Sequence, residues 1–173
     1  ELERLAGLFI ENGYKEADIN MGCPFPLVAG KHKGSGMLPY PAEVEALLRE
    51  LARYPELHFS VKMRLGWERA DEWRSLLPLL NAAPLRRITL HPRIGKQQYK
   101  GEADREAFAA FYSECTHPLA YNGDLQTVDD IRMVEEAFPR LEGVMLGRGL
   151  LVNPALAWEY AEGTVLSSAD LTD

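Results

Sequence analysis

The chain has 173 residues, of which 46% are hydrophobic and 26% charged, a composition typical of an ordinary globular domain. Its apolar runs fall short of the roughly 18 residues that a membrane-spanning helix needs, and its net charge of −7 argues against a broad nucleic-acid-binding face. Two cysteines and four scattered histidines give neither a disulfide framework nor the spacing of a metal site. We therefore expect a cytoplasmic protein with no membrane contact and no bound metal.

The first half of the chain predicts two strands, each preceded by an amphipathic helix. A helix over 2–12 ends at a Gly turn, and a short strand follows over 15–20. Gly22 and Pro24 then force a turn at the cysteine between them. After a polar loop over 30–36, a second helix runs from Pro41 to Tyr54, and the alternating stretch 57–65 predicts the second strand, with Lys62 and Arg64 near its end.

The second half repeats the same pattern three times. The predicted elements are a helix over 71–83, a strand over 87–90, a helix over 103–115, a strand over 118–121, a helix capped by Thr127, a strand over 141–146 and a helical segment over 154–160. Each strand ends in a polar turn: His91-Pro92-Arg93, Asn122-Gly123-Asp124 and Gly147-Arg148-Gly149. We expect the tail after Gly163 to be frayed.

The strand spacing predicts an α/β protein built from parallel βα repeats. Right-handed crossovers place every loop that follows a strand at one edge of such a sheet. In barrels of this kind that edge is catalytic, and phosphate binds in the loops after the last two strands. These loops are the Asn-Gly-Asp and Gly-Arg-Gly turns, where glycine admits an anion close to backbone N–H groups. Alternatively, both are ordinary turns.

The position of Cys23 on a turn allows two interpretations of its thiol. A cysteine on a turn after a strand is placed to meet a ligand, and a thiol that is mostly protonated at neutral pH can act as a general acid. The alternative is an inert residue, since cysteine is among the most buried residue types. Cys115, on a predicted helix, has the character of a small core residue.

Six segments together resemble the tRNA-dihydrouridine synthases, which are FMN-dependent TIM-barrel oxidoreductases. They are INMGCP at 19–24, KGSGML at 33–38, VKMRLG at 61–66, HPRIGKQQYKG at 91–101, NGDL at 122–125 and VMLGRGLLVNP at 144–154. The chain departs from the family pattern at Pro92, where the family more often has Gly.

The resemblance implies a partial TIM barrel with five of the eight strands. Residues 1–163 would form the C-terminal part of the FMN-binding catalytic domain. The tail over 164–173 would lead toward a helical tRNA-binding domain that lies outside this sequence, as would the first three strands. The chain starts inside a predicted helix without an initiator Met, so we expect it to be a piece of a longer protein.

The implied reaction is reduction of the C5=C6 bond of uridine in tRNA, with NADPH as the reductant. Hydride from reduced FMN adds at C6, and Cys23 donates a proton at C5. The residues implied to hold FMN are Lys62 and His91 at the ring, and Asn122, Gly123, Asp124, Gly147 and Arg148 along the ribityl phosphate. The residues implied to contact the tRNA substrate are Asn20, Arg64, Arg93, Lys96, Gln98 and Tyr99.

Two alternatives remain open. A non-redox barrel enzyme could use the same glycine turns for a phosphorylated metabolite, which leaves Cys23 without a role. The chain by itself could also be inactive, since five of eight barrel strands leave two unpaired edges that favour self-association. In that case we expect it to bind flavin poorly and to bury its open edges against a second copy.

Overall fold

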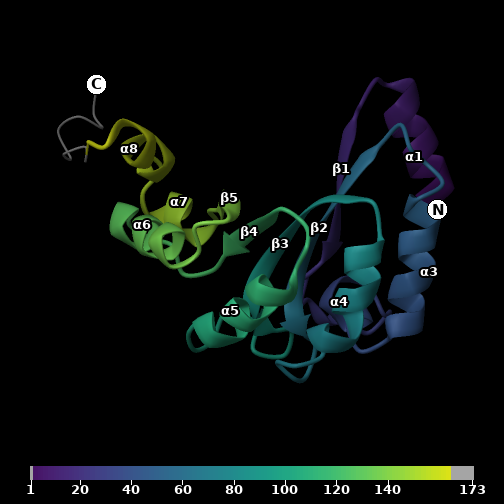
Figure 1. Ribbon diagram of the computed structural model, residues 1–173, viewed down its shortest axis with the longest axis horizontal. Helices are drawn as coiled ribbons and strands as arrows, with labels where there is room; N and C mark the ends of the chain where they lie inside the picture. Colours follow the sequence, from purple (N-terminus) through teal and green to yellow (C-terminus); the bar gives the residue numbers. More distant parts are fainter. Residues whose placement is uncertain (1, 165–173) are drawn as a thin grey trace.

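The computed structural model describes residues 2–164, in which five parallel strands form one sheet. The strands lie side by side in chain order, and Figure 1 shows the sheet curving through the middle of the molecule. They are β1 (Glu16–Met21), β2 (His58–Gly66), β3 (Leu85–Ile94), β4 (Leu119–Asn122) and β5 (Leu141–Met145).

Helices connect each strand to the next one. The longer ones are α1 (Leu2–Glu11), α3 (Pro41–Leu51), α4 (Trp73–Ala82), α5 (Arg105–Glu114) and α6 (Val128–Ala137). The shorter ones are α2 (Pro26–Ala29), the 3₁₀ helix η1 (Gly34–Met37), α7 (Arg148–Val152) and α8 (Leu156–Glu162). Consecutive parallel strands with helical crossovers are the arrangement of a TIM-barrel segment, so the predicted α/β fold of parallel βα repeats is confirmed.

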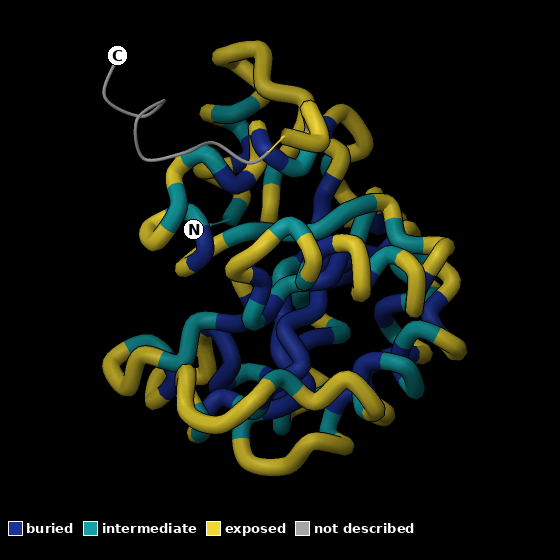
Figure 2. The backbone as a smooth tube through the Cα atoms, turned by 90° about the vertical axis from the view of Figure 1, so that its left-hand side faces the viewer, coloured by how far each residue is buried: buried dark blue, intermediate teal, exposed yellow. Residues whose placement is uncertain are grey.

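One face of the sheet is apolar because it packs against the helices. Val61 and Met63 of β2 and Ile88 and Leu90 of β3 are fully buried there, together with Phe111 of α5. The buried backbone runs through the centre of the molecule in Figure 2, with exposed segments around it. The nearly continuous burial of β2, β3 and β4 fits their position as the interior strands of the sheet.

The opposite face carries polar side chains at matching heights on neighbouring strands. Asn20 of β1 pairs in register with Lys62 of β2, which pairs with Thr89 of β3. Two residues further along the same strands, Arg64 pairs in register with His91. Register therefore places Lys62 and His91 on one face and near one edge of the sheet, as parallel pairing of the two strands requires.

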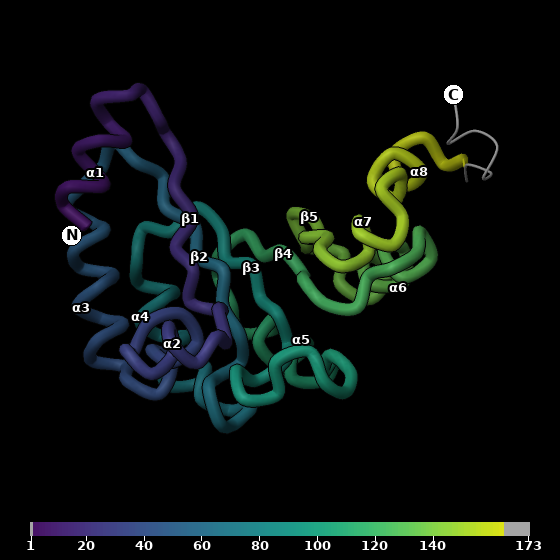
Figure 3. Tube along the Cα trace, turned by 180° about the vertical axis from the view of Figure 1, so that it is seen from behind, coloured from purple at the N-terminus to yellow at the C-terminus, as the bar shows by residue number. Residues whose placement is uncertain are grey.

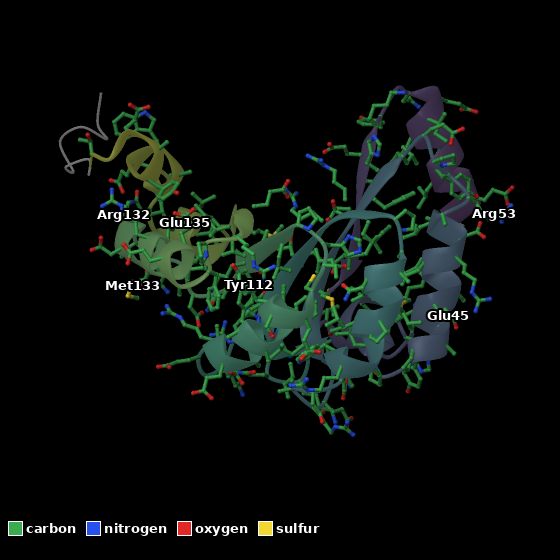
Figure 4. The ribbon with its side chains drawn as sticks, in the orientation of Figure 1. Glu45, Arg53, Tyr112, Arg132, Met133 and Glu135 are labelled. Atoms are coloured by element: carbon green, nitrogen blue, oxygen red, sulfur yellow. The ribbon has the colours of Figure 1, made fainter. Side chains whose placement is uncertain are left out.

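Local signals explain where the longer helices begin and how the C-terminal ones attach. Pro41 starts α3, and a capping box between Thr127 and Asp130 starts α6. The Tyr160 hydroxyl of α8 donates a hydrogen bond of 2.6 Å to Glu135 of α6, which is labelled in Figure 4. Helices α6, α7 and α8 thus gather at the end of the sheet opposite α1 (Figures 1 and 3).

The structure differs from the sequence prediction in two respects. Strand β3 extends to Ile94, so that His91 and Arg93 lie within a strand and not in a turn after it. The sequence also did not predict α2, η1 and α7, which have at most five residues each and therefore show no helical periodicity. The prediction of a frayed tail falls largely on 165–173, outside the described residues. No helix within 2–164 has the length and apolar character to cross a membrane.

Candidate active site

A cavity of about 240 Å³ opens at the carboxyl edge of β2, β3, β4 and β5. An adjoining, wider cleft of about 890 Å³ shares Tyr99, Asp124, Gln126 and Arg148 with it. The cavity is lined by Lys62, His91, Tyr99, Asn122, Gly123, Asp124, Leu125, Gln126, Met145, Leu146, Gly147, Arg148 and Gly149. All seven residues that the sequence assigned to a cofactor are in this set.

Cys23 sits on a turn whose backbone is held from both sides. The Asn20 side-chain oxygen accepts hydrogen bonds from the backbone N–H groups of Gly22 and Cys23, at 3.0 and 2.9 Å. The Ser35 hydroxyl donates to the Cys23 carbonyl at 2.9 Å. Gly34, with φ +57°, lies so close that a Cβ there would be 2.6 Å from the same carbonyl oxygen. These contacts fix the backbone of Cys23, whose side chain is partly buried.

Lys62 brings a partly buried ammonium group to the cavity wall. Its Nζ lies next to Gly22, 3.2 Å from the point that a Cβ would occupy there. Burial, followed by the charge of Arg64, lowers the pKa of Lys62 to about 8, while Asp18 and Cys23 act in the opposite direction. The ammonium makes no hydrogen bond or ion pair with the rest of residues 2–164, so it is available to an anionic or carbonyl ligand.

His91 is 4% exposed and belongs to a chain of polar contacts. Its Nε2 lies 3.0 Å from Nη1 of Arg93, and Nη2 of Arg93 donates to the Gly101 carbonyl at 2.6 Å and to Asp124 at 2.5 Å. Burial and the nearby Arg64, Lys62 and Arg93 cations lower the pKa of His91 to about 3. The imidazole is therefore neutral at physiological pH.

Asp124 connects the two ends of the cavity. Its Oδ2, which accepts from Arg93, also accepts a 2.9 Å hydrogen bond from the Ala103 amide. Its Oδ1 accepts a 2.8 Å hydrogen bond from Arg148. Partial burial alone raises the pKa of Asp124, but the hydrogen bonds from Arg93 and Ala103 outweigh it and hold this pKa below its usual value. The carboxylate is thus ionised and orients both arginines.

Arg64 is 1% exposed and joins the cysteine turn to the loop after β3. Its Nε donates to the Gly22 carbonyl at 3.0 Å, and its Nη1 donates to the Ile94 and Gln98 carbonyls at 2.9 and 2.7 Å. Arg93 is similarly enclosed, at 2% exposure. Both side chains therefore hold backbone segments in place, and their predicted contacts with substrate stay predictions.

The other residues predicted to meet the substrate are more accessible. Tyr99 is 57% exposed, with the guanidinium carbons of Arg148 and Arg64 at 4.9 and 5.5 Å from its ring centre. Lys96 forms an exposed 2.5 Å ion pair with Glu68. Gln98 adopts a left-handed backbone conformation with φ +53°. Tyr99 is the only one of these that lines the cavity.

The sequence missed several lining and supporting residues. Leu125, Gln126, Met145 and Leu146 line the cavity because they flank the two glycine turns, a position that the strand-end pattern could have indicated. Ser35, which holds the cysteine carbonyl from twelve residues away, lies in the KGSGML segment but was not assigned to the site. Cys23 itself is not a lining residue, but the preceding Gly22 lies against the Lys62 side chain at the cavity wall.

Comparisons with known proteins identify the family. The model described as dihydrouridine synthase (Dus) matches residues 1–169. The tRNA-dihydrouridine synthase B of Pasteurella multocida (strain Pm70) is 30% identical over 90% of this chain and 47% of its own length. The probable tRNA-dihydrouridine synthase 2 of Bacillus subtilis (strain 168) is 36% identical over 83% of this chain and 45% of its own length. The chain spans about half the length of the curated relatives it matches.

A solved structure supports the fold independently. Histamine dehydrogenase from Rhizobium sp. 4-9 matches 92% of this chain and 26% of its own chain, with a TM-score of 0.66 and 12% sequence identity. At that identity the likeness concerns the fold alone. The family model covers nearly the whole chain, so this chain belongs to the dihydrouridine synthase family.

Proposed function

We propose that this chain is part of an FMN-dependent enzyme that reduces the C5=C6 bond of uridines in tRNA and takes its electrons from NADPH. The observation that supports this most is the cavity at the carboxyl edge of the sheet. It combines the unpaired Lys62 ammonium and the neutral His91 with Arg148 and two glycine turns. The proposal also rests on membership of the family and on relatives named as tRNA-dihydrouridine synthases.

The polar groups of the cavity fit FMN at both ends of the cofactor. A cation at the wall suits the electron-rich edge of a reduced flavin ring, and Lys62 has no competing partner among the described residues. At the far end, Arg148 supplies a guanidinium, Gly147 leaves room for close approach of a phosphate group, and Gly123 lines the same cavity. Asn122 and Asp124 lie between and offer polar contacts for the ribityl hydroxyls.

FMN held in this cavity would supply a hydride for C6 of the uridine. Cys23 donates the proton that completes the reduction at C5, from a position that Asn20 and Ser35 hold in place. Lys62 stabilises negative charge beside this turn. Tyr99, which is exposed and lines the cavity, offers its ring to an extruded base. The further substrate contacts that we propose are Asn20, Arg64, Arg93, Lys96 and Gln98.

We further propose that residues 1–163 are the C-terminal part of a TIM-barrel catalytic domain, working in the cytoplasm with a helical tRNA-binding domain after it. The relatives' greater length supports this, since each is about twice as long as the matched region. The chain alone would then bind flavin poorly, be inactive and self-associate through its open sheet edges.

The test uses the full-length protein that carries this chain. We expect it to purify yellow, to lose its flavin absorbance on addition of NADPH, and to form dihydrouridine in unmodified tRNA. Cys23→Ala should leave flavin reduction by NADPH intact and lower dihydrouridine formation by about 10²–10⁴-fold, the usual cost of losing a general acid. Cys115→Ala, which removes the buried cysteine, is the matched control and should retain both activities. A full-length protein that does not bind flavin would overturn the proposal and favour the non-redox alternative.

A further inference from the structure

The contact between Arg93 and His91 determines where the imidazole carries its proton. Nη1 of Arg93 lies 3.0 Å from Nε2 of His91. A guanidinium group has N–H donors and no acceptor, so Nε2 must accept with its lone pair. A neutral imidazole carries one N–H, which then has to be on Nδ1. Burial of a doubly protonated ring beside three cations is unfavourable, consistent with a pKa of about 3 for His91.

Arg93 cannot turn away from the ring without losing its other partners. Its Nη2 donates to the Gly101 carbonyl and to Asp124, and the side chain is 2% exposed. Asp124 is held in turn by the Ala103 amide and by Arg148. The guanidinium is therefore fixed by an ionised carboxylate and a backbone carbonyl before it meets the imidazole.

The orientation of the ring is determined by the same contacts. A 180° turn about the Cβ–Cγ bond would bring Cε1 opposite Nη1 of Arg93 and leave a buried donor without a partner, which is costly. The Cδ2–Nε2 side of the ring also lies against Gly123, where a Cβ would be only 3.2 Å from Cδ2. Gly123, at φ +146°, thus leaves the space that this ring position requires.

We propose that Arg93 is a positioning residue which, held by Asp124 and Gly101, fixes His91 as the Nδ1–H tautomer and so makes Nδ1–H a hydrogen-bond donor for the cavity ligand. His91 lines the cavity, and Nδ1 makes no hydrogen bond with the rest of residues 2–164. The ligand group that Nδ1–H selects is an acceptor, a carbonyl oxygen or an unprotonated ring nitrogen. That this acceptor belongs to a flavin rests on the proposed function, whereas the tautomer does not.

The tautomer is measured directly by ¹⁵N NMR of the histidine-labelled chain at neutral pH without flavin, because protonated and unprotonated ring nitrogens have well-separated shifts. His91→Gln identifies the His91 signals. His117 provides an internal reference of the opposite kind: its Nε2 lies 2.8 Å from the Leu80 carbonyl oxygen, so Nε2 must carry the proton there. We expect Nδ1–H for His91 and Nε2–H for His117 in the same spectrum.

Two variants test whether Arg93 sets the tautomer. In Arg93→Met, the population ratio of Nδ1–H to Nε2–H at His91 should fall at least about tenfold, as expected for losing a charge-assisted hydrogen bond. Arg93→Lys, which keeps a cationic donor, should restore part of this ratio. The His117 signals should stay unchanged in both variants, which excludes a general loss of structure. If Arg93→Met does not fold, Asp124→Asn takes its place, because it weakens the grip on the guanidinium and should move the ratio in the same direction.

An Nε2–H tautomer at His91 in the unaltered chain would overturn the proposal. So would a folded Arg93→Met or Asp124→Asn variant whose His91 signals match those of the parent chain. Neither result depends on flavin binding, so the proposed function can fail while this inference stands, and the reverse also holds.

Discussion

At the residue scale, His91 links the chemistry of the site to the stability of the fold. Burial and neighbouring cations lower its pKa to about 3, against about 6.5 in an unfolded chain. Between these two values the unfolded state binds a proton that the folded state does not. The free energy of unfolding must therefore fall as the pH falls from about 6.5 toward 3, and the loss is absent above pH 6.5.

Replacing the imidazole should remove this pH dependence. In His91→Gln, the difference in unfolding free energy between pH 7.5 and pH 4.5 should shrink by roughly 2–3 kcal/mol, the linkage contribution of a single histidine with this shift. Urea unfolding of the parent chain and the variant at both pH values measures it. Equal pH dependence in the two proteins would show that His91 takes up a proton as easily in the folded state as in the unfolded state.

Gly34 is a second residue whose identity matters, because the turn at Cys23 leaves no space for a side chain there. Its φ of +57° disfavours any side chain, and a Cβ would come within 2.6 Å of the Cys23 carbonyl oxygen and 3.0 Å of the Cys23 Cβ. We expect Gly34→Ala to lower the unfolding free energy by roughly 1–3 kcal/mol. Gly143→Ala is the control, since a Cβ there has no atom within 4 Å. Similar urea midpoints for both variants would contradict this reading of the turn.

At the element scale, Arg64 connects β2 to the loops that follow β1 and β3. Its three hydrogen bonds reach the carbonyls of Gly22, Ile94 and Gln98. No apolar side chain can replace them, and each carbonyl left buried without a donor carries a desolvation cost. The positions of both loops therefore depend on the buried Arg64 side chain.

Arg64→Met should accordingly loosen the loop after β3 and cost roughly 3 kcal/mol of unfolding free energy. Hydrogen exchange of the amides over 95–100 should accelerate at the same time. Arg74→Met is the control, because Arg74 is an exposed residue whose ion pair with Glu114 contributes little. Unaltered exchange in the Arg64 variant would mean that the loop is held by other contacts.

The elements that the sequence predicted are those with strong local signals. Helix α3 begins at Pro41, and helix α6 begins directly after its N-cap residue Thr127, as these two residues indicated. Strand β3 was predicted too short because His91-Pro92-Arg93 has the polar composition of a turn. These residues extend a buried strand because His91 and Arg93 satisfy one another and Asp124 neutralises the charge. Asp124 lies 31 positions after Arg93, so this neutralisation leaves no local signal in the sequence.

The residues of the candidate site could be predicted from the sequence to a similar degree. Parallel strands bring their carboxyl ends together, so the grouping of Lys62, His91 and the two glycine turns could be predicted. The burial of Arg64 and Arg93 could not, since their acceptors are backbone carbonyls on other loops. Composition favours exposed arginines, and only the folded chain shows which ones are enclosed.

At the scale of the whole molecule, the sheet ends in two strands that each have a single neighbour among the described residues. These are β1 and β5, and Figure 1 shows them at opposite sides of the curved sheet. Beside β5, helix α7 exposes two large apolar side chains, Leu151 at 85% and Val152 at 74%. An unpaired edge next to an exposed apolar pair is a site for association with another chain.

We therefore expect the 19.4 kDa chain to self-associate by itself, through the β5 edge and α7. Leu151→Lys combined with Val152→Lys should shift the mass measured by light scattering toward the monomer, because two charges beside the edge oppose the approach of a second copy. Neither side chain is buried, so the fold should tolerate the change. Met133→Lys, which alters a 49% exposed residue on α6, should leave the association unchanged. A chain that is monomeric across a wide range of concentrations and retains stoichiometric FMN would show that five strands already complete the site.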